Sequence, residues 1–289
     1  MRKKKTRRWI AAIAAAAVLS LLGWALVWGN TALVTANVLV CSNGIPEAFD
    51  AYKIVQISDL HDAQIGENNE KLITMTAETE PDCIVLTGDF VDSSRFHPER
   101  SLSVAEALVK IAPVYYVSGN HEAILPDADY QALTDGLRAL GVCVLEDESA
   151  ELTRGGQSIR LIGLTDIGFH PGTLEEKKDA LRTALSALLP EDEFSVTLAH
   201  RPELMDVYTE CGAPLVLSGH AHGGQIRLPG IGGLIAPGQG LFPKYTEGKY
   251  EENGTTLVVS RGIGNSVLPL RVNDRPQIVV VQLACNYRM

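Results

Sequence analysis

Histidine, aspartate and asparagine residues recur at one kind of position in this sequence, directly after a short apolar run. The segment LSGHAHGGQ (217–225) places His220 and His222 one residue apart among glycines, and four other apolar runs end in a similar way. Five of the 7 histidines follow such a run. We therefore interpret them as parts of one site and not as isolated structural histidines. The polar residues of this set are Asp59, His61, Asp89, Asn120, His121, His200, His220 and His222.

These residue types indicate divalent metal ions. Imidazole, carboxylate and amide groups without a thiolate suit manganese, iron(II) or zinc better than a structural zinc cluster, which usually includes cysteine. The set without His121 offers more ligands than one tetrahedral ion takes, whereas two ions bridged by one carboxylate would use them all. Such a pair, about 3.5 to 4 Å apart, clamps the attacking and leaving oxygens of a phosphoryl group. The predicted cofactor is a pair of divalent ions, and the predicted reaction is hydrolysis of a phosphate ester.

The elements that must position these side chains are strands alternating with helices. Short apolar runs predict buried strands, and amphipathic segments between them predict helices. Strands alternating with helices predict a layered α/β domain, in which ligands gather just beyond the strand ends. Strands are predicted within 52–62, 81–92, 112–122, 194–203 and 213–225, a hairpin over 151–164, a strand pair at the end of the chain, and helices over 67–79, 101–111, 127–140 and 175–189.

Five motifs in sequence order resemble the calcineurin-like metallophosphoesterases. They are Asp-x-His at 59–61, Gly-Asp-x-x-Asp at 88–92, Gly-Asn-His-Glu at 119–122, a lone His200, and Gly-His-x-His at 219–222. Each motif alone is weak, but five in the right order are highly specific. The segments SDLH, LSGHAHGGQ and SRGIGNSVLPLR are similar to the membrane-associated bacterial branch with YaeI-like and YkuE-like proteins. The resemblance covers nearly all of residues 50–285.

The resemblance implies a fold, a metal-ligand set and a catalytic residue. The fold would be a four-layer sandwich of two facing mixed β-sheets flanked by helices. His121 would stabilise the transition state or protonate the leaving oxygen. Ala221 stands where this branch often has threonine, which puts only the surroundings of the ligands in doubt. By the same resemblance Asp59, His61, Asp89 and His222 would hold the first ion, and Asp89, Asn120, His200 and His220 the second, with Asp89 bridging.

Three other features are open to more than one interpretation. Asp92 either orients a ligand or caps a helix. The loop over 228–243 is rich in glycine, proline and large apolar residues, and forms either an apolar lip for a lipid or glycolipid substrate or a loop folded onto the core. Cys83 and Cys143 lie in apolar, strand-like contexts and are expected to be buried thiols.

The N-terminal segment predicts membrane attachment. Residues 1–8 carry six basic side chains and no acid, and residues 9–28 form an uncharged run long enough to cross a bilayer as one helix. A cleaved signal peptide, twin-arginine-like in sequence, is the alternative; tryptophans at both ends of the run and a poor cleavage site favour an anchor. The predicted organisation is a cytoplasmic flank over 1–8, an anchor over 9–28, a linker with a first strand over 29–49, and an extracytoplasmic catalytic domain over 50–289.

The charge balance narrows the range of partners. The formal net charge is −10, and the six basic residues of the flank make the rest of the chain more acidic still. Nucleic-acid binding needs a basic track, so a nucleic acid is not expected as a partner. The partners expected are the membrane and a phosphate ester that is lipid- or glycan-linked.

The sequence thus predicts a membrane-anchored dimetal phosphoesterase that hydrolyses a phosphodiester or pyrophosphate bond of an envelope-linked substrate. One alternative is a pyrophosphatase of the UDP-2,3-diacylglucosamine type, although outward topology argues against a cytosolic substrate. The alternative from another class is a catalytically silent metal-binding module of the envelope.

Overall fold

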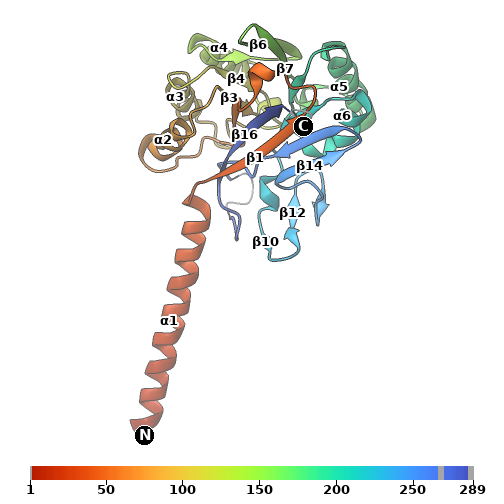
Figure 1. Ribbon diagram of the computed structural model, residues 1–289. Helices are drawn as coiled ribbons and strands as arrows, with labels where there is room; N and C mark the ends of the chain where they lie inside the picture. Colours follow the sequence, from red (N-terminus) through yellow and green to blue (C-terminus); the bar gives the residue numbers. More distant parts are fainter. Residues whose placement is uncertain (1, 266–269, 286–289) are drawn as a thin grey trace.

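Two six-stranded mixed β-sheets form the centre of the protein, shown in Figure 1. The computed structural model describes residues 2–265 and 270–285, and within the N-terminal helix the side chains at 2–8, 11, 21–22 and 24–26 lie outside the described set. The first sheet has the order β1 (Val34–Ser42), β16 (Gln277–Cys285), β2 (Lys53–Ile57), β3 (Cys83–Thr87), β4 (Val114–Val117) and β5 (Cys143–Val144). The second has the order β14 (Gly248–Glu252), β15 (Thr255–Val259), β9 (Leu215–Ser218), β8 (Ser195–Leu198), β7 (Gln157–Gly163) and β6 (Glu148–Arg154).

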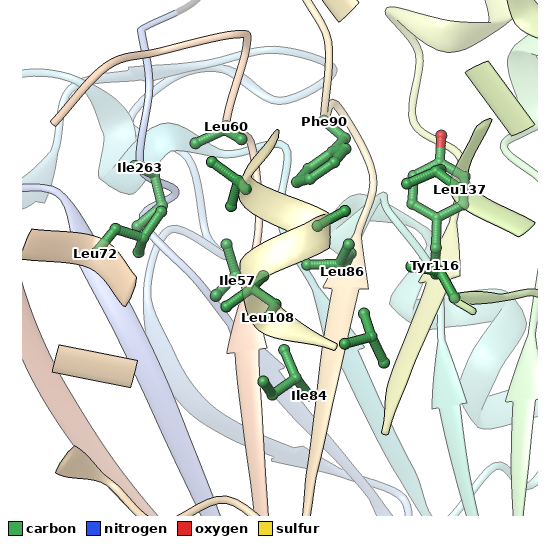
Figure 2. Packing of buried hydrophobic residues seen from close by; sticks show 14 of the residues in the cluster. Ile57, Leu60, Leu72, Ile84, Leu86, Phe90, Leu108, Tyr116, Leu137 and Ile263 are labelled. Atoms are coloured by element: carbon green, nitrogen blue, oxygen red, sulfur yellow. The ribbon is translucent and has the colours of Figure 1, made fainter. Parts of the chain in front are cut away.

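Alternation along the strands explains why the sheets pack in layers. On β3, Cys83 and Val85 point into a cluster shared by both sheets, whereas Ile84 and Leu86 point into a second cluster beneath helices. Figure 2 shows this second cluster, with Leu108 and Leu137 of the covering helices against the strand residues. Because both faces of the strand are buried, every residue of β3 is apolar or threonine.

Five helices cover the outer faces. α2 (Glu70–Glu78), α3 (Pro98–Leu108) and α4 (Asp127–Ala139) contribute to the cluster on the first sheet. α5 (Leu174–Leu188) and α6 (Met205–Cys211) contribute to a third cluster on the second sheet. Burial of large apolar side chains, each contributing about 1.5 to 3 kcal/mol, stabilises these contacts.

Parallel pairing brings the predicted strand ends to one region. β2, β3 and β4 are mutually parallel in the first sheet, and β7, β8, β9 and β15 are parallel in the second. Parallel neighbours place their carboxyl ends at the same edge of a sheet, so the residues that follow each strand meet there. The segments after β2, β3, β4, β8 and β9 carry the polar motifs.

The secondary structure follows most of the expectations, with differences at the boundaries. The third predicted helix begins at the expected residue, and α3 begins three residues before its predicted start because Pro98 occupies its first turn. β6 and β7 form the predicted hairpin around Gly155 and Gly156. The prediction of two buried thiols is wrong for one of them. Cys83 is buried in a central strand, whereas Cys143 is exposed because β5 is a two-residue strand at the sheet edge.

The N-terminal residues form a single helix, α1 (Arg2–Thr31), which extends away from the sheets in Figure 1. Among the described residues, no helix combines the length and the apolar character that crossing a membrane requires. The structure therefore does not support the transmembrane anchor predicted over residues 9–28. Directly after α1, β1 pairs in parallel with β16, so the first sheet includes residues before position 50.

Candidate metal centre

The structure brings the predicted ligands together in two buried groups that share one carboxylate. Asp59 and His61 follow β2, Asp89 follows β3, Asn120 follows β4, His200 follows β8, and the last two histidines follow β9. The first group is Asp59, His61, Asp89 and His222, and the second is Asp89, His200 and His220; within each group the ligand atoms lie within 4.8 Å of one another.

In the first group, the ring nitrogens of two histidines and two carboxylate oxygens converge on one small volume. His61 Nε2 lies 3.3 Å from His222 Nε2 and 3.6 Å from Asp89 Oδ2. His222 Nε2 lies 3.5 Å from Asp59 Oδ1. Two imidazole nitrogens and two carboxylate oxygens that face one small volume match the donor set of a borderline divalent ion.

The second group has the same character and includes the asparagine. His200 Nε2 lies 3.2 Å from Asp89 Oδ2 and 3.2 Å from Asn120 Oδ1. His220 Nε2 is buried and has no hydrogen-bond partner. A buried polar atom without a partner is costly, and a bound cation would satisfy it. The residues present therefore fit two divalent ions with Asp89 between them.

Unusual backbone angles aim these side chains. Asp59, His61, Asp89, His220 and His222 all have positive φ, between 44° and 65°. Non-glycine residues in this region cost on the order of 1 to 3 kcal/mol each and persist where the surrounding structure determines them. Both histidines of the Gly-His-x-His motif bend the backbone themselves, which sends the two rings to different groups.

Glycines provide close approach beside these bends. A Cβ at position 88 would lie 2.6 Å from His200 Nδ1, and one at position 219 would collide with the Asp59 carboxylate. Any other residue at Gly88 or Gly219 would therefore displace a side chain of the two groups.

His121 lies beside the first group but belongs to neither. Its ring packs edge-on against His61, with 4.4 Å between ring centroids. Its Nδ1 accepts a hydrogen bond from the Ser93 backbone N–H at 3.2 Å. Because an N–H group only donates, Nδ1 is an acceptor and the neutral ring carries its proton on Nε2. The other two histidines, His97 and His170, lie in loops outside both groups.

Comparison with known proteins decides the family. A family model described as calcineurin-like phosphoesterase matches residues 52–224, which is more than half of the chain and includes both groups. The chain belongs to the calcineurin-like phosphoesterases. It is therefore a metal-dependent phosphoesterase, of a family that uses two divalent ions, and not the catalytically silent module considered as an alternative.

Relatives support the same assignment over most of the chain. The metallophosphoesterase YkuE of Bacillus subtilis (strain 168) is 34% identical over 86% of this chain and 85% of its own. The phosphodiesterase YaeI of Escherichia coli (strain K12) is 28% identical over 80% of this chain and 82% of its own. Among solved structures, TT1561 of Thermus thermophilus superposes with a TM-score of 0.51 at 15% identity, over 74% of this chain and 90% of its own, which shows likeness of fold.

Burial keeps three imidazoles of the phosphoesterase neutral. It lowers the pKa of His61 to about 4 and holds the pKa values of His220 and His222 well below the usual range. For His222, the positive charge of Arg271, and that of His61 whenever its ring is protonated, add to this effect. Neutral imidazoles offer lone pairs, which is the form that a metal ion needs.

His200 differs from the other three imidazoles because it pairs with Asp89. Burial disfavours the charged form of each, but their mutual attraction and hydrogen bond outweigh burial. This raises the pKa of His200 to about 10 and holds the pKa of Asp89 well below its usual range. Without metal, His200 is therefore protonated at neutral pH.

Metal binding is expected to release a proton from His200. A pKa of about 10 places the metal-free imidazole in its protonated form at pH 7.5, and a ligand must give up that proton. We expect about one proton per protein on addition of Mn²⁺ to metal-free protein, from this mechanism. Calorimetric titration in two buffers of different protonation enthalpy measures the number. Equal heats in both buffers would show that His200 is already neutral.

Two buried charged residues were missed by the sequence interpretation. The Glu122 carboxylate accepts backbone N–H groups of Asp89, Phe90, Val91 and Gly119, and so ties the loop after β3 to the loop after β4. The signal was available, since Glu122 ends the Gly-Asn-His-Glu motif.

Arg271 is the second. It is buried, donates to Gly264 O and to Asp274 Oδ2, and lies 3.5 Å from His222 Nδ1. It is the last residue of the segment SRGIGNSVLPLR, which indicated the family resemblance but no role for this arginine.

Asp92 faces the centre and does not cap the following helix. The N-cap residue of α3 is His97. Asp92 Oδ1 accepts the Ser94 N–H and lies 3.8 Å from His121 Nδ1, and Oδ2 pairs with Arg95. The helix-cap interpretation is therefore wrong, and Asp92 supports the segment that orients His121.

Proposed function

We propose that this phosphoesterase hydrolyses a phosphodiester or pyrophosphate bond of a membrane- or envelope-linked substrate. The observation that carries the proposal is the sharing of Asp89 between two buried ligand groups, which suits two closely spaced ions. The phosphodiesterase name of YaeI, 28% identical, supports a diester as substrate.

Each residue of the centre has a role in this proposal. Asp59, His61, Asp89 and His222 would hold one ion, and Asp89, Asn120, His200 and His220 the other. When bound, such ions polarise the phosphoryl oxygens and lower the pKa of a water molecule toward neutrality. Glu122 and Arg271 fix the loops that carry these ligands. His121 would act as the acid in its charged form, in which Nδ1 donates to Ser93 Oγ at 3.1 Å and Nε2 gives its proton to the leaving oxygen, leaving the neutral ring.

A cavity of about 290 Å³ beside His61 gives room for one substituent of the ester. Its wall includes His61 of the first group and Asp92, which supports the His121 segment. Arg95, His97 and Arg100 also line it and give it polar donors. The cavity can hold one of the two substituents of a diester.

A comparison of two chromogenic esters tests the reaction. The purified full chain with Mn²⁺ is expected to hydrolyse bis-p-nitrophenyl phosphate faster than p-nitrophenyl phosphate, and to lose both activities with a chelator. Faster hydrolysis of the monoester would overturn the proposed diester preference while leaving the family assignment intact.

We also propose that the catalytic domain lies outside the cytoplasm, held at the membrane by the N-terminal segment. The basic residues before an apolar run and the exposed side chains of Trp9, Ile13 and Leu19 on α1 support this proposal. Alkaline phosphatase fused after Met289 is expected to be active in intact cells, and a cytoplasmic reporter at the same position inactive. The reverse pattern would restore the cytosolic pyrophosphatase as the preferred alternative.

A further inference from the structure

Large apolar side chains gather on the loop between residues 228 and 242. Outside α1, nine such side chains are exposed among the described residues, and five of them lie on this loop. This clustering is unlike the scattered exposure usual on a soluble surface, and marks a contact surface. The five residues, with their exposed fractions, are Leu228 (39%), Ile231 (63%), Ile235 (42%), Leu241 (68%) and Phe242 (65%).

The backbone of the loop is held in place while these side chains point outward. Two short strand pairs, β10 (Arg227–Leu228) with β11 (Gly232–Gly233) and β12 (Ile235–Ala236) with β13 (Gly240–Leu241), fold it into a protrusion. The Gln239 side chain bonds to both the N–H and the C=O of Tyr245. The exposed side chains are therefore presented by an ordered structure, and the interpretation of a loop folded onto the core does not hold for them.

The loop is attached directly to the metal centre. The Leu234 N–H bonds to the carbonyl of Gly224, two residues after His222. A side chain at Gly238 would collide with Glu203, whose carboxylate lies 3.5 Å from His220 Nε2. Leu234 and Gly238 of the loop therefore lie close to residues that hold or touch the last two histidines of the centre.

The end of α1 contacts residues 271–275, which in turn contact the start of the same loop. The Asn30 Oδ1 accepts the Arg271 N–H, and the Arg275 guanidinium lies over the Trp28 ring, 4.7 Å from its centroid. Val272 lies between these two arginines. Its carbonyl accepts a hydrogen bond from the backbone N–H of Arg227, the residue just before the loop. Figure 1 shows α1 leaving the domain on the side where β10 and β12 protrude.

We propose that the loop over 228–242 is a docking surface for a lipid bilayer. Exposed apolar side chains on α1 and on the loop lie on one side of the domain, and a bilayer would cover both at once. Leucine, isoleucine and phenylalanine enter the boundary between head groups and acyl chains, where large apolar side chains gain most. Docking holds the metal centre at the level of the head groups, where a phosphate ester of a lipid lies. This inference does not depend on the proposed reaction.

Tryptophan fluorescence tests the docking. In the full chain with its 3 tryptophans, Trp9, Trp24 and Trp28, replaced by phenylalanine, Phe242→Trp reports on the loop. Leu174→Trp is the matched control, since Leu174 is 56% exposed at the start of α5, away from α1. With phosphatidylcholine and phosphatidylglycerol vesicles, we expect the Phe242→Trp emission to shift to shorter wavelength and to be quenched when the acyl chains are brominated. The Leu174→Trp emission should stay unchanged.

Equal quenching of the two variants, or of neither, would overturn the proposal. A shift of the Phe242→Trp emission that depends on protein concentration without vesicles would overturn it in favour of a second copy of the chain on this surface. If Phe242→Trp fails to fold, Leu241→Trp replaces it. The readout needs no catalysis, so absence of activity on either chromogenic ester bears on the proposed reaction alone.

Discussion

Replacing Asp89 with asparagine is expected to abolish hydrolysis and to release at least one metal ion. Asp89 is the only residue that both ligand groups of the described chain share, so one substitution removes a negative charge from both. Two unit charges 4 Å apart interact by about 4 kcal/mol at an effective dielectric constant of 20. Loss of one such attraction toward a divalent ion weakens its binding about a thousandfold or more. Metal analysis of the purified variant and its kcat measure the two losses together.

Asp89→Asn removes the negative charge of the side chain and keeps its shape. An amide has the outline of a carboxylate. Its oxygen can still accept the hydrogen bond that Asp89 Oδ1 accepts from the backbone N–H of His121 at 2.8 Å. Asp92→Asn is the matched control, because Asp92 is a buried carboxylate three residues away that belongs to neither group. It should keep both ions. A variant at position 89 that retained two ions and near-normal turnover would show that Asp89 does not bridge them.

The location of the centre was predictable because it depends on local pattern and on one rule of topology. Each ligand follows an apolar run such as Ile54–Ile57 or Ile84–Thr87, and parallel strands bring their carboxyl ends to one edge. Recognising the two strands was enough to predict that Asp59 and Asp89 lie close together. Their assignment to particular ions stays a prediction, which the position-89 variant tests for the shared ligand.

The supporting residues were harder to predict because long-range contacts define them. Glu122 is a buried carboxylate that is stable there only because four backbone N–H groups from two loops surround it. Arg271 lies 49 residues beyond His222, and no local pattern joins them. The parallel pairing of β1 with β16 likewise joins the two ends of the chain. Such contacts follow from tertiary packing and leave no periodic signal in the sequence.

The backbone of the ligands also departs from what residue type suggests. Glycine is the residue that tolerates positive φ, so Gly223 and Gly224 would be the natural places for the segment LSGHAHGGQ to bend. Both have positive φ, 61° and 80°, but His220 and His222 carry positive φ as well. The histidines are held there by contacts such as the hydrogen bond from the His220 N–H to Asp59. Propensity rules are overridden where function requires a particular direction.

Replacing His121 with alanine is expected to lower kcat by about 10² to 10⁴, the usual contribution of a general acid. The acid is the charged ring, in which Nδ1 donates to Ser93 Oγ at 3.1 Å and Nε2 carries the proton that is transferred. His121 belongs to neither ligand group, so the variant should keep both ions and much of its substrate affinity. Metal analysis and kcat on bis-p-nitrophenyl phosphate are the measurements. His170→Ala, at a loop histidine outside both groups, is the control and should leave kcat unchanged.

The dependence on the leaving group then separates two roles for His121. p-Nitrophenolate is stable as an anion and needs little protonation, whereas an alkoxide leaves only when it is protonated. If His121 is the acid, the loss in kcat is smaller for the p-nitrophenyl diester than for a methyl or glyceryl diester. An equal loss for good and poor leaving groups would mean that the ring stabilises charge on the phosphoryl oxygens. Loss of metal together with activity would make His121 a ligand, and would contradict the division into two groups that exclude it.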